Sequence, residues 1–125
     1  MLGGIYYWQF LKKDSADFLS SISLAPGQAM IAIDFGFKGQ ERFFKGEVVE
    51  DMSLLDALRV SAMAGNLELE INGDVGAEKI VKIDGLSQGK DGGSWHYYLG
   101  NQKLNNSPSE IFIKPGDRFK FVYEK

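Results

Sequence analysis

The sequence contains no cysteine and only one histidine, His96, among its 125 residues. The lack of cysteine excludes disulfides, thiol nucleophiles and thiolate zinc sites. No further ligands stand at metal-motif spacing around His96, so we expect no metal site. Proline is also rare, with three residues against fifteen glycines. This balance is typical of a β-rich fold with many tight turns.

No part of the sequence carries a large excess of charge of one sign. The chain has 17 acidic and 14 basic residues, a formal net charge of −3, and both signs are interspersed. A nucleic-acid partner would need a basic stripe that neutralises phosphates, so we expect none. No serine lies in a nucleophile elbow, and no glycine loop has the spacing of a nucleotide fingerprint. We therefore expect the protein not to be an enzyme.

No apolar run reaches the roughly 20 residues that a transmembrane helix needs. The most apolar stretch lies near the amino end and is followed by Lys12 and Lys13. It lacks the basic start and cleavage site of a signal peptide. Residues 1–28 therefore form an N-terminal extension with two interpretations. It is either a helix or the remnant of a membrane anchor, because aromatic residues before lysines are typical of a membrane boundary. The helix would carry on one face Trp8, Leu11, Phe18, Leu19 and Ile22.

Residues 29–125 are expected to form one domain, since Ala25-Pro26-Gly27 breaks the preceding segment. Alternation over residues 31–37 predicts a strand with one buried face, and residues 42–49 return as its hairpin partner. A helix should follow, with Ser53 as its cap and Asp56 completing a capping box. Gly65 is predicted to supply the left-handed residue that ends this helix.

Shorter strands are predicted further along the chain, over residues 67–71, 79–84, 95–99 and 119–123, with a short return near Lys103–Leu104. Within the second of these, Val81 and Ile83 should point inward. The order of hairpin, helix and short strands predicts an α+β fold of the β-grasp (ubiquitin-like) type. A mixed sheet would pack on one main helix, and the first and last strands of the domain would be neighbours at its centre.

Four motifs in this order carry a family resemblance: SLLDALRVSA, VKIDGL, GGSWHYYLGNQ and FIKPGDRFKFVYEK. Together they resemble the transcobalamin C-terminal-like family, over roughly Ala29 to Lys125. Its bacterial members are β-grasp domains of surface or secreted proteins, related to the C-terminal domain of cobalamin carriers. The resemblance implies cobalamin as a candidate cofactor and an extracytoplasmic or cell-surface location. The anchor interpretation of residues 1–28 adds attachment to a membrane. This sequence departs from the family pattern at Gly100–Asn101, where the usual Asn-Gly is reversed.

The candidate ligand-binding residues lie on the aromatic strand and the loops at its two ends. They are Trp95, His96, Tyr98, Asn101, Lys90 and Asp91. Alternation places Trp95, Tyr97 and Leu99 on one face, which is the expected core, and His96 with Tyr98 on the other. Aromatic faces can stack on a flat ligand or a sugar. The acidic run Glu47, Glu50 and Asp51 is interpreted as a solvated surface.

Three functional hypotheses follow. The first is a non-catalytic module of a bacterial surface protein that binds a small ligand, a glycan or a protein through the aromatic strand. The second is a cobalamin-binding domain, by direct analogy with the carriers. The third is a structural spacer in a larger surface protein. The natural ligand and the oligomeric state do not follow from the sequence.

Overall fold

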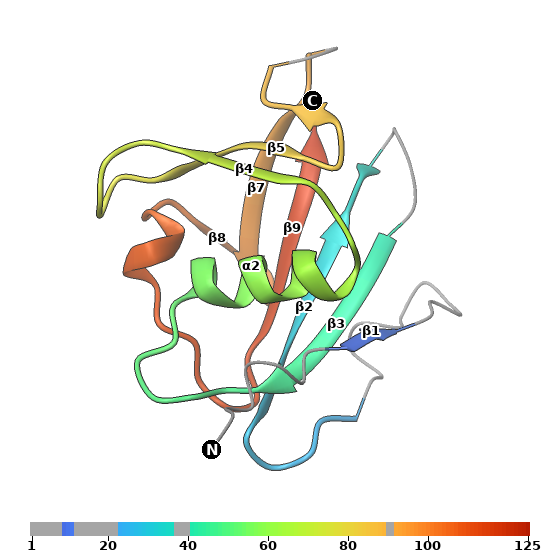
Figure 1. Cartoon of the computed structure of the whole chain (residues 1–125), viewed down its shortest axis with the longest axis vertical. Helices are drawn as coiled ribbons and strands as arrows, with labels where there is room; N and C mark the ends of the chain where they lie inside the picture. Colours follow the sequence, from blue (N-terminus) through green and yellow to red (C-terminus); the bar gives the residue numbers. More distant parts are fainter. Residues whose placement is uncertain (1–8, 12–22, 37–40, 90–91) are drawn as a thin grey trace.

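The computed structural model describes residues 9–11, 23–36, 41–89 and 92–125, and shows a small mixed α/β domain with two sheets (Figure 1). In chain order, its elements are β1 (Gln9–Leu11), β2 (Gln28–Asp34), β3 (Glu41–Glu47), α2 (Leu54–Ala64), β4 (Leu69–Asn72), β5 (Lys79–Ile83), β6 (Leu86–Ser87), β7 (Ser94–Leu99), β8 (Gln102–Leu104), the 3-10 turn η4 (Pro108–Glu110) and β9 (Arg118–Glu124). In the described part of the chain, α2 is the one α-helix, as predicted.

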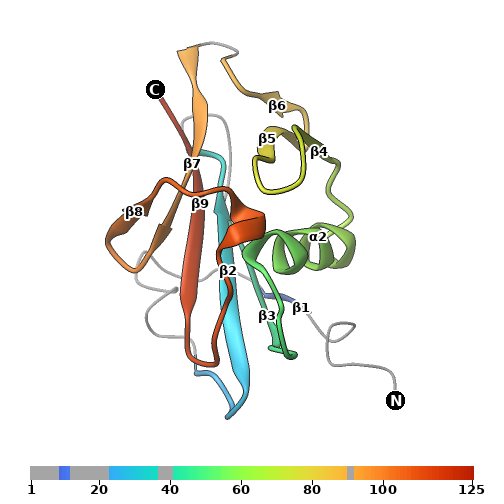
Figure 2. The same cartoon turned by 90° about the vertical axis from the view of Figure 1, so that its left-hand side faces the viewer.

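The larger sheet has six strands in the order β1-β3-β2-β9-β7-β8. β2 and β3 form the predicted antiparallel hairpin, and β2 runs parallel to β9 at the centre. The predicted adjacency of the first and last strands of the domain is therefore confirmed. Helix α2 and the three-stranded sheet β4-β5-β6 form a second layer on one face of the large sheet (Figure 2).

Alternating apolar residues place the main core between these two layers. In β9, Phe119, Phe121 and Tyr123 are buried, while the residues between them are only partly buried. The prediction that β2 buries one face was wrong. Ala32 is as fully buried as Ile31, because it packs in a second apolar cluster with Met30, Phe43 and Leu24. A central strand that is covered on both sides has no solvent-exposed face, so its sequence need not alternate between apolar and polar residues.

Helix α2 begins as predicted. The Ser53 side chain accepts a hydrogen bond from the backbone N–H of Asp56 at 3.0 Å, and the Asp56 carboxylate accepts one from the N–H of Ser53 at 3.0 Å. This reciprocal capping box satisfies two donors that a helix start leaves free. The core side of the helix presents Leu54, Leu55, Ala57, Leu58, Ser61 and Ala62. Met63 lies outside this core side and is 76% exposed.

The end of α2 corrects the prediction for Gly65. This glycine has a φ of −91°, and the left-handed residue is Asn66, with a φ of 56°. Asparagine tolerates that conformation better than most residues. Gly65 is needed for a different reason: a Cβ there would lie 2.7 Å from the Phe44 ring. The glycine allows the end of the helix to lie directly against the core.

The small sheet contains an irregularity that the sequence did not predict. Glu70 pairs with Lys82, but the next residue, Ile71, pairs with Ile80, so Val81 is an extra residue in β5. This bulge reverses the face of the residues before it. Ile80 and Ile83 are therefore buried, and Val81, predicted to point inward, is only half-buried. The predicted turn at Asp84–Gly85 is confirmed, with positive φ at both residues.

The amino-terminal prediction is only partly covered by the described residues. Gln9–Leu11 forms β1, which pairs antiparallel with β3 at one edge of the large sheet. Leu11 therefore lies in a strand and not in the predicted helix. Residues 1–8 and 12–22, which carry the rest of that prediction, lie outside the described part of the chain. Among the described residues, no helix combines the length and apolar character needed to cross a membrane.

Candidate functional site

Part of the edge of β7 has no neighbouring strand in the described structure. On one side β9 pairs with β7 from Ser94 to Leu99, but on the other side β8 pairs only with Tyr97–Leu99. The segment Ser94–His96 thus has an open side. There the backbone N–H of Trp95 donates to the side-chain oxygen Oε1 of Gln88 at 2.7 Å. A side-chain amide takes the place where a neighbouring strand would supply a carbonyl.

A pocket of about 440 Å³ lies beside this open edge, and we call it the edge pocket. It is lined by Trp95, His96 and Tyr97 of β7, residues 76–80 of the β4–β5 hairpin, Gln88, and Asn105 and Ser107 of the chain after β8. The pocket therefore combines main-chain groups of a strand with carboxamide, hydroxyl, imidazole and carboxylate side chains. Pockets of this size with a few convergent polar groups are typical ligand sites.

Trp95 forms the inner boundary of the edge pocket. It is 5% exposed, and its indole N–H donates to the carbonyl of Leu86 at 2.9 Å. Its ring packs edge-on against Phe35, with centroids 5.8 Å apart, and tilted against Tyr123 at 5.1 Å. The expectation that Trp95 belongs to the core is confirmed. Because the side chain is almost fully buried, its ring cannot serve as an open stacking platform.

His96 is half-buried and lines the edge pocket. Its Nε2 atom is 3.0 Å from the hydroxyl oxygen of Ser94. Ser94 and His96 are two positions apart on one strand, so this contact is the local spacing of side chains on the same face. No carboxylate in the described part of the chain is hydrogen-bonded to the other ring nitrogen. The pair thus lacks the orienting group of a catalytic triad.

The other predicted site residues do not meet at the edge pocket. The hydroxyl of Tyr98 donates to the Glu124 carboxylate, at 3.0 Å to Oε1 and 3.2 Å to Oε2, and burial together with that carboxylate raises the pKa of Tyr98. Asn101 is exposed in the turn between β7 and β8. Lys90 and Asp91 lie outside the described residues. The structure thus brings Trp95 and His96 together at the pocket and leaves Tyr98 and Asn101 away from it.

Glu78 forms part of the far wall, and the sequence analysis missed it. Its Oε1 atom accepts hydrogen bonds from the backbone N–H of Gly76 at 3.0 Å and from the hydroxyls of Ser107 at 3.1 Å and Ser109. These bonds, that of Ser109 first, lower the pKa of Glu78. The carboxylate connects the β4–β5 hairpin to η4. It keeps the two sides of the pocket together and stays ionised to a lower pH than an ordinary glutamate.

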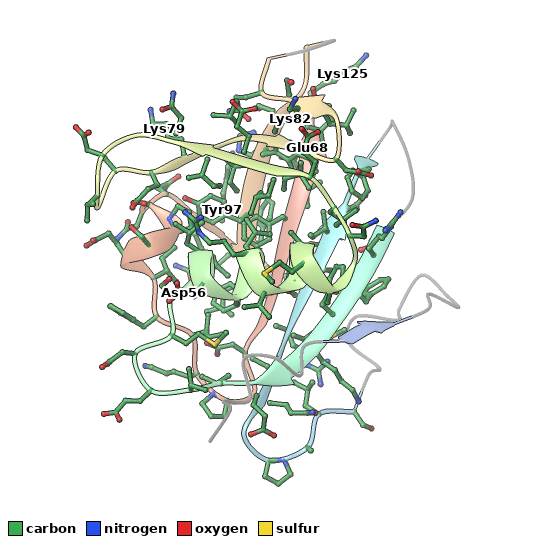
Figure 3. The ribbon with its side chains drawn as sticks, in the orientation of Figure 1. Asp56, Glu68, Lys79, Lys82, Tyr97 and Lys125 are labelled. Carbon is green, nitrogen blue, oxygen red and sulfur yellow. The ribbon has the colours of Figure 1, made fainter. Side chains whose placement is uncertain are left out.

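Tyr97 holds the chain after β8 away from the open edge. Its hydroxyl donates to the backbone carbonyl of Asn106, and its ring packs on Phe121 with centroids 5.4 Å apart. Burial raises the pKa of Tyr97. Figure 3 labels this ring and shows Lys79 extending outward from the β4–β5 hairpin. Lys79 is nevertheless among the residues that line the edge pocket.

A second hollow of about 360 Å³ lies at the start of α2, lined by residues 49–52 with Asp56, Arg59 and Val60. It includes Glu50 and Asp51 of the acidic run. The Asp56 carboxylate is already used in the capping box. Among the described residues, no three His, Cys, Asp or Glu side chains are grouped so that they could hold a metal ion. This hollow has fewer convergent polar groups than the edge pocket and is the weaker candidate.

Comparisons with known proteins add one finding on the fold. No protein-family model matches the chain. No curated protein matches it either. Among solved structures, it is similar to the crystal structure of a "putative metal binding protein" from Ruminococcus gnavus ATCC 29149, with a TM-score of 0.59 and 17% sequence identity. The match covers 78% of this chain and 96% of that chain. At this level of identity the likeness concerns the fold alone.

Proposed function

We propose that the chain is a non-catalytic binding domain and that its ligand site is the edge pocket. The observation that carries this proposal is the open edge at Ser94–His96, where a strand without a neighbour borders a polar concavity. Such an edge offers main-chain donors and acceptors to a ligand at fixed positions. The Ser94–His96 pair lacks an orienting carboxylate in the described structure, which supports binding over catalysis.

The proposal includes the β-grasp fold and the transcobalamin-like family. The hairpin β2–β3, the crossing helix α2 and the parallel neighbours β2 and β9 support a β-grasp arrangement. The family resemblance supports a bacterial surface or secreted protein and makes cobalamin the first named ligand to test. The proposed membrane anchor is supported by the sequence pattern of residues 1–28. His96 would then be the imidazole beside the corrin.

The test is an amide NMR titration of the full chain with cobalamin and, separately, with a panel of oligosaccharides. A ligand of this site should shift the signals of residues 76–80, Gln88 and residues 94–97 in a saturable way. An Asn101→Ala variant is the matched control, since Asn101 is exposed and outside the pocket. Saturable shifts confined to the hollow at residues 49–52 would move the site to the start of α2 and refute the edge pocket.

A further inference from the structure

We propose that the occupant of the edge pocket is an extended peptide segment, which adds to β7 as a short antiparallel strand and displaces the side chain of Gln88. This inference rests on the proposed function and names the ligand class of that site. Peptides commonly bind in this way to open sheet edges, with main-chain bonds giving affinity and side-chain pockets giving specificity.

The main-chain geometry of Trp95 supports strand addition. Its N–H points away from β9, as the bond to Gln88 shows. The N–H and C=O of one strand residue point to the same neighbour, so the Trp95 carbonyl faces the pocket as well. One residue of an antiparallel peptide would pair with both groups. The open segment Ser94–His96 is matched by a peptide of about three residues, roughly 10 Å long at 3.3 Å per residue.

Gln88 already imitates such a peptide. Its carboxamide has the same chemical groups as a peptide bond, and its oxygen accepts from Trp95 N–H at a distance of 2.7 Å. The residue is exposed, so its side chain can move into solvent when a ligand arrives. A peptide carbonyl would restore the hydrogen bond, and the N–H of the same peptide residue would add a second bond, to the Trp95 carbonyl.

The neighbouring strand is kept off this edge. The chain after β8 would reach Trp95 if the β7–β8 pairing continued beyond Tyr97 and Leu104. Instead, the hydroxyl of Tyr97 holds the backbone of Asn106. The bonds of Ser107 to Glu78 fix the next residues to the β4–β5 hairpin. The gap is therefore maintained by specific contacts.

Charge indicates which side chain the peptide carries. A residue opposite Trp95 would point to the same side of the sheet as Trp95, toward the β4–β5 hairpin. The Glu78 carboxylate lines the pocket there, and the Glu110 carboxylate approaches within 3.3 Å of where a Cβ on Gly76 would lie. With Glu78 and Glu110 set against Lys79 of the lining, the carboxylates are in excess and favour a lysine or arginine at the central position of the peptide.

The experiment compares three capped tripeptides by amide NMR on the full chain. The probe is acetyl-Val-Lys-Val-amide. The first control carries a methyl group on the backbone nitrogen of its lysine, and the second has norleucine in place of lysine. Because methylation removes the donor to the Trp95 carbonyl, the methylated peptide should bind at least several-fold more weakly. The norleucine peptide should also bind more weakly, and Glu78→Gln, which leaves Glu110 in place, should reduce the difference between lysine and norleucine. Equal binding of the probe and its methylated form would overturn strand addition.

A protein variant provides the second arm. Gln88→Ala removes the competing amide, so the probe should bind about 2- to 10-fold more tightly, the range of one hydrogen bond. Asn101→Ala should leave its affinity unchanged. Weaker or unaltered binding to Gln88→Ala contradicts the displacement. If cobalamin or a glycan shifts the pocket signals and the peptide does not, the peptide inference fails and the binding site stands. If none of these ligands shifts them, the proposed function fails too.

Discussion

The contact between Gly65 and Phe44 gives a prediction that can be worked through in numbers. Alanine at position 65 would place its Cβ 2.7 Å from Cζ and 2.9 Å from Cε1 of the Phe44 ring. Ordinary carbon–carbon contacts lie at about 3.5–4.0 Å, so the ring or the helix end must move by roughly 0.8 Å. Phe44 is fully buried in the main core, and its ring cannot turn toward solvent.

Overpacking of this kind costs about 1–3 kcal/mol. The loss of chain entropy in the unfolded state offsets about 0.4–1 kcal/mol of that, because alanine restricts the unfolded chain more than glycine. The midpoints of these two ranges lead us to expect that Gly65→Ala lowers the free energy of unfolding by about 1.3 kcal/mol. For a domain of this size the melting temperature should fall by roughly 2–8 °C.

Urea denaturation followed by far-UV circular dichroism measures the change. Asn66 supplies the matched controls, since it carries the left-handed conformation with a φ of 56°. Asn66→Gly should be nearly neutral, and Asn66→Ala should cost about 1 kcal/mol. A Gly65→Ala variant as stable as the native protein would show that the helix end moves freely, and would refute the reasoning from close approach.

Three further predictions concern caps and titrating groups. Ser53→Ala removes the hydroxyl that caps Asp56 N–H and should cost about 1 kcal/mol in urea denaturation; no loss would contradict the cap's role. Ser109→Ala should raise the pKa of Glu78, because the hydrogen bond from Ser109 lowers that pKa more than any other contact. An NMR titration of the carboxyl group measures the change. Since a lowered pKa stabilises the fold above the ordinary value of 4.5, the stability difference between native and variant should shrink as the pH falls below that value; a difference independent of pH would be inconsistent with this. Burial raises the pKa of Tyr97 above 10.0, so its contribution to stability should be complete below that pH and disappear as the pH rises through the raised pKa. The tyrosinate absorbance of the native chain, compared with that of Tyr97→Phe, measures the pKa of Tyr97. Ionisation of Tyr97 at or below pH 10.0 would contradict the raised pKa.

Local patterns in the sequence predicted local structure well. The capping box of Ser53 and Asp56 is confirmed, since its two residues are three apart and each side chain accepts from the other's backbone N–H. The turn at Asp84–Gly85 and the hairpin β7–β8 are confirmed for the same reason. The adjacency of β2 and β9 was predicted from the order of elements, which leaves few ways to close a mixed sheet.

Features that depend on distant partners were not predictable. Glu78 and Ser109 are 31 positions apart, and no local pattern in either segment predicts that they form a hydrogen bond. The bulge at Val81 depends on the register of β5 against β4. The open edge of β7 exists because β8 ends early. Trp95 and His96 were identified as candidates from their residue types, but their shared pocket arises from four separate segments of the chain.

The central position of β9 has a consequence for the synthesis of the chain. Met30 of β2 and its partner Arg118 of β9 are 88 residues apart in the sequence. At about 5–20 residues per second, a ribosome needs roughly 4–18 s to deliver the second after the first. During this interval the inner edge of β2 has no partner strand, and such edges pair readily with other chains. The domain therefore completes its sheet only after β9 has been synthesised, and the exposed hairpin is the part that a nascent-chain chaperone would have to protect.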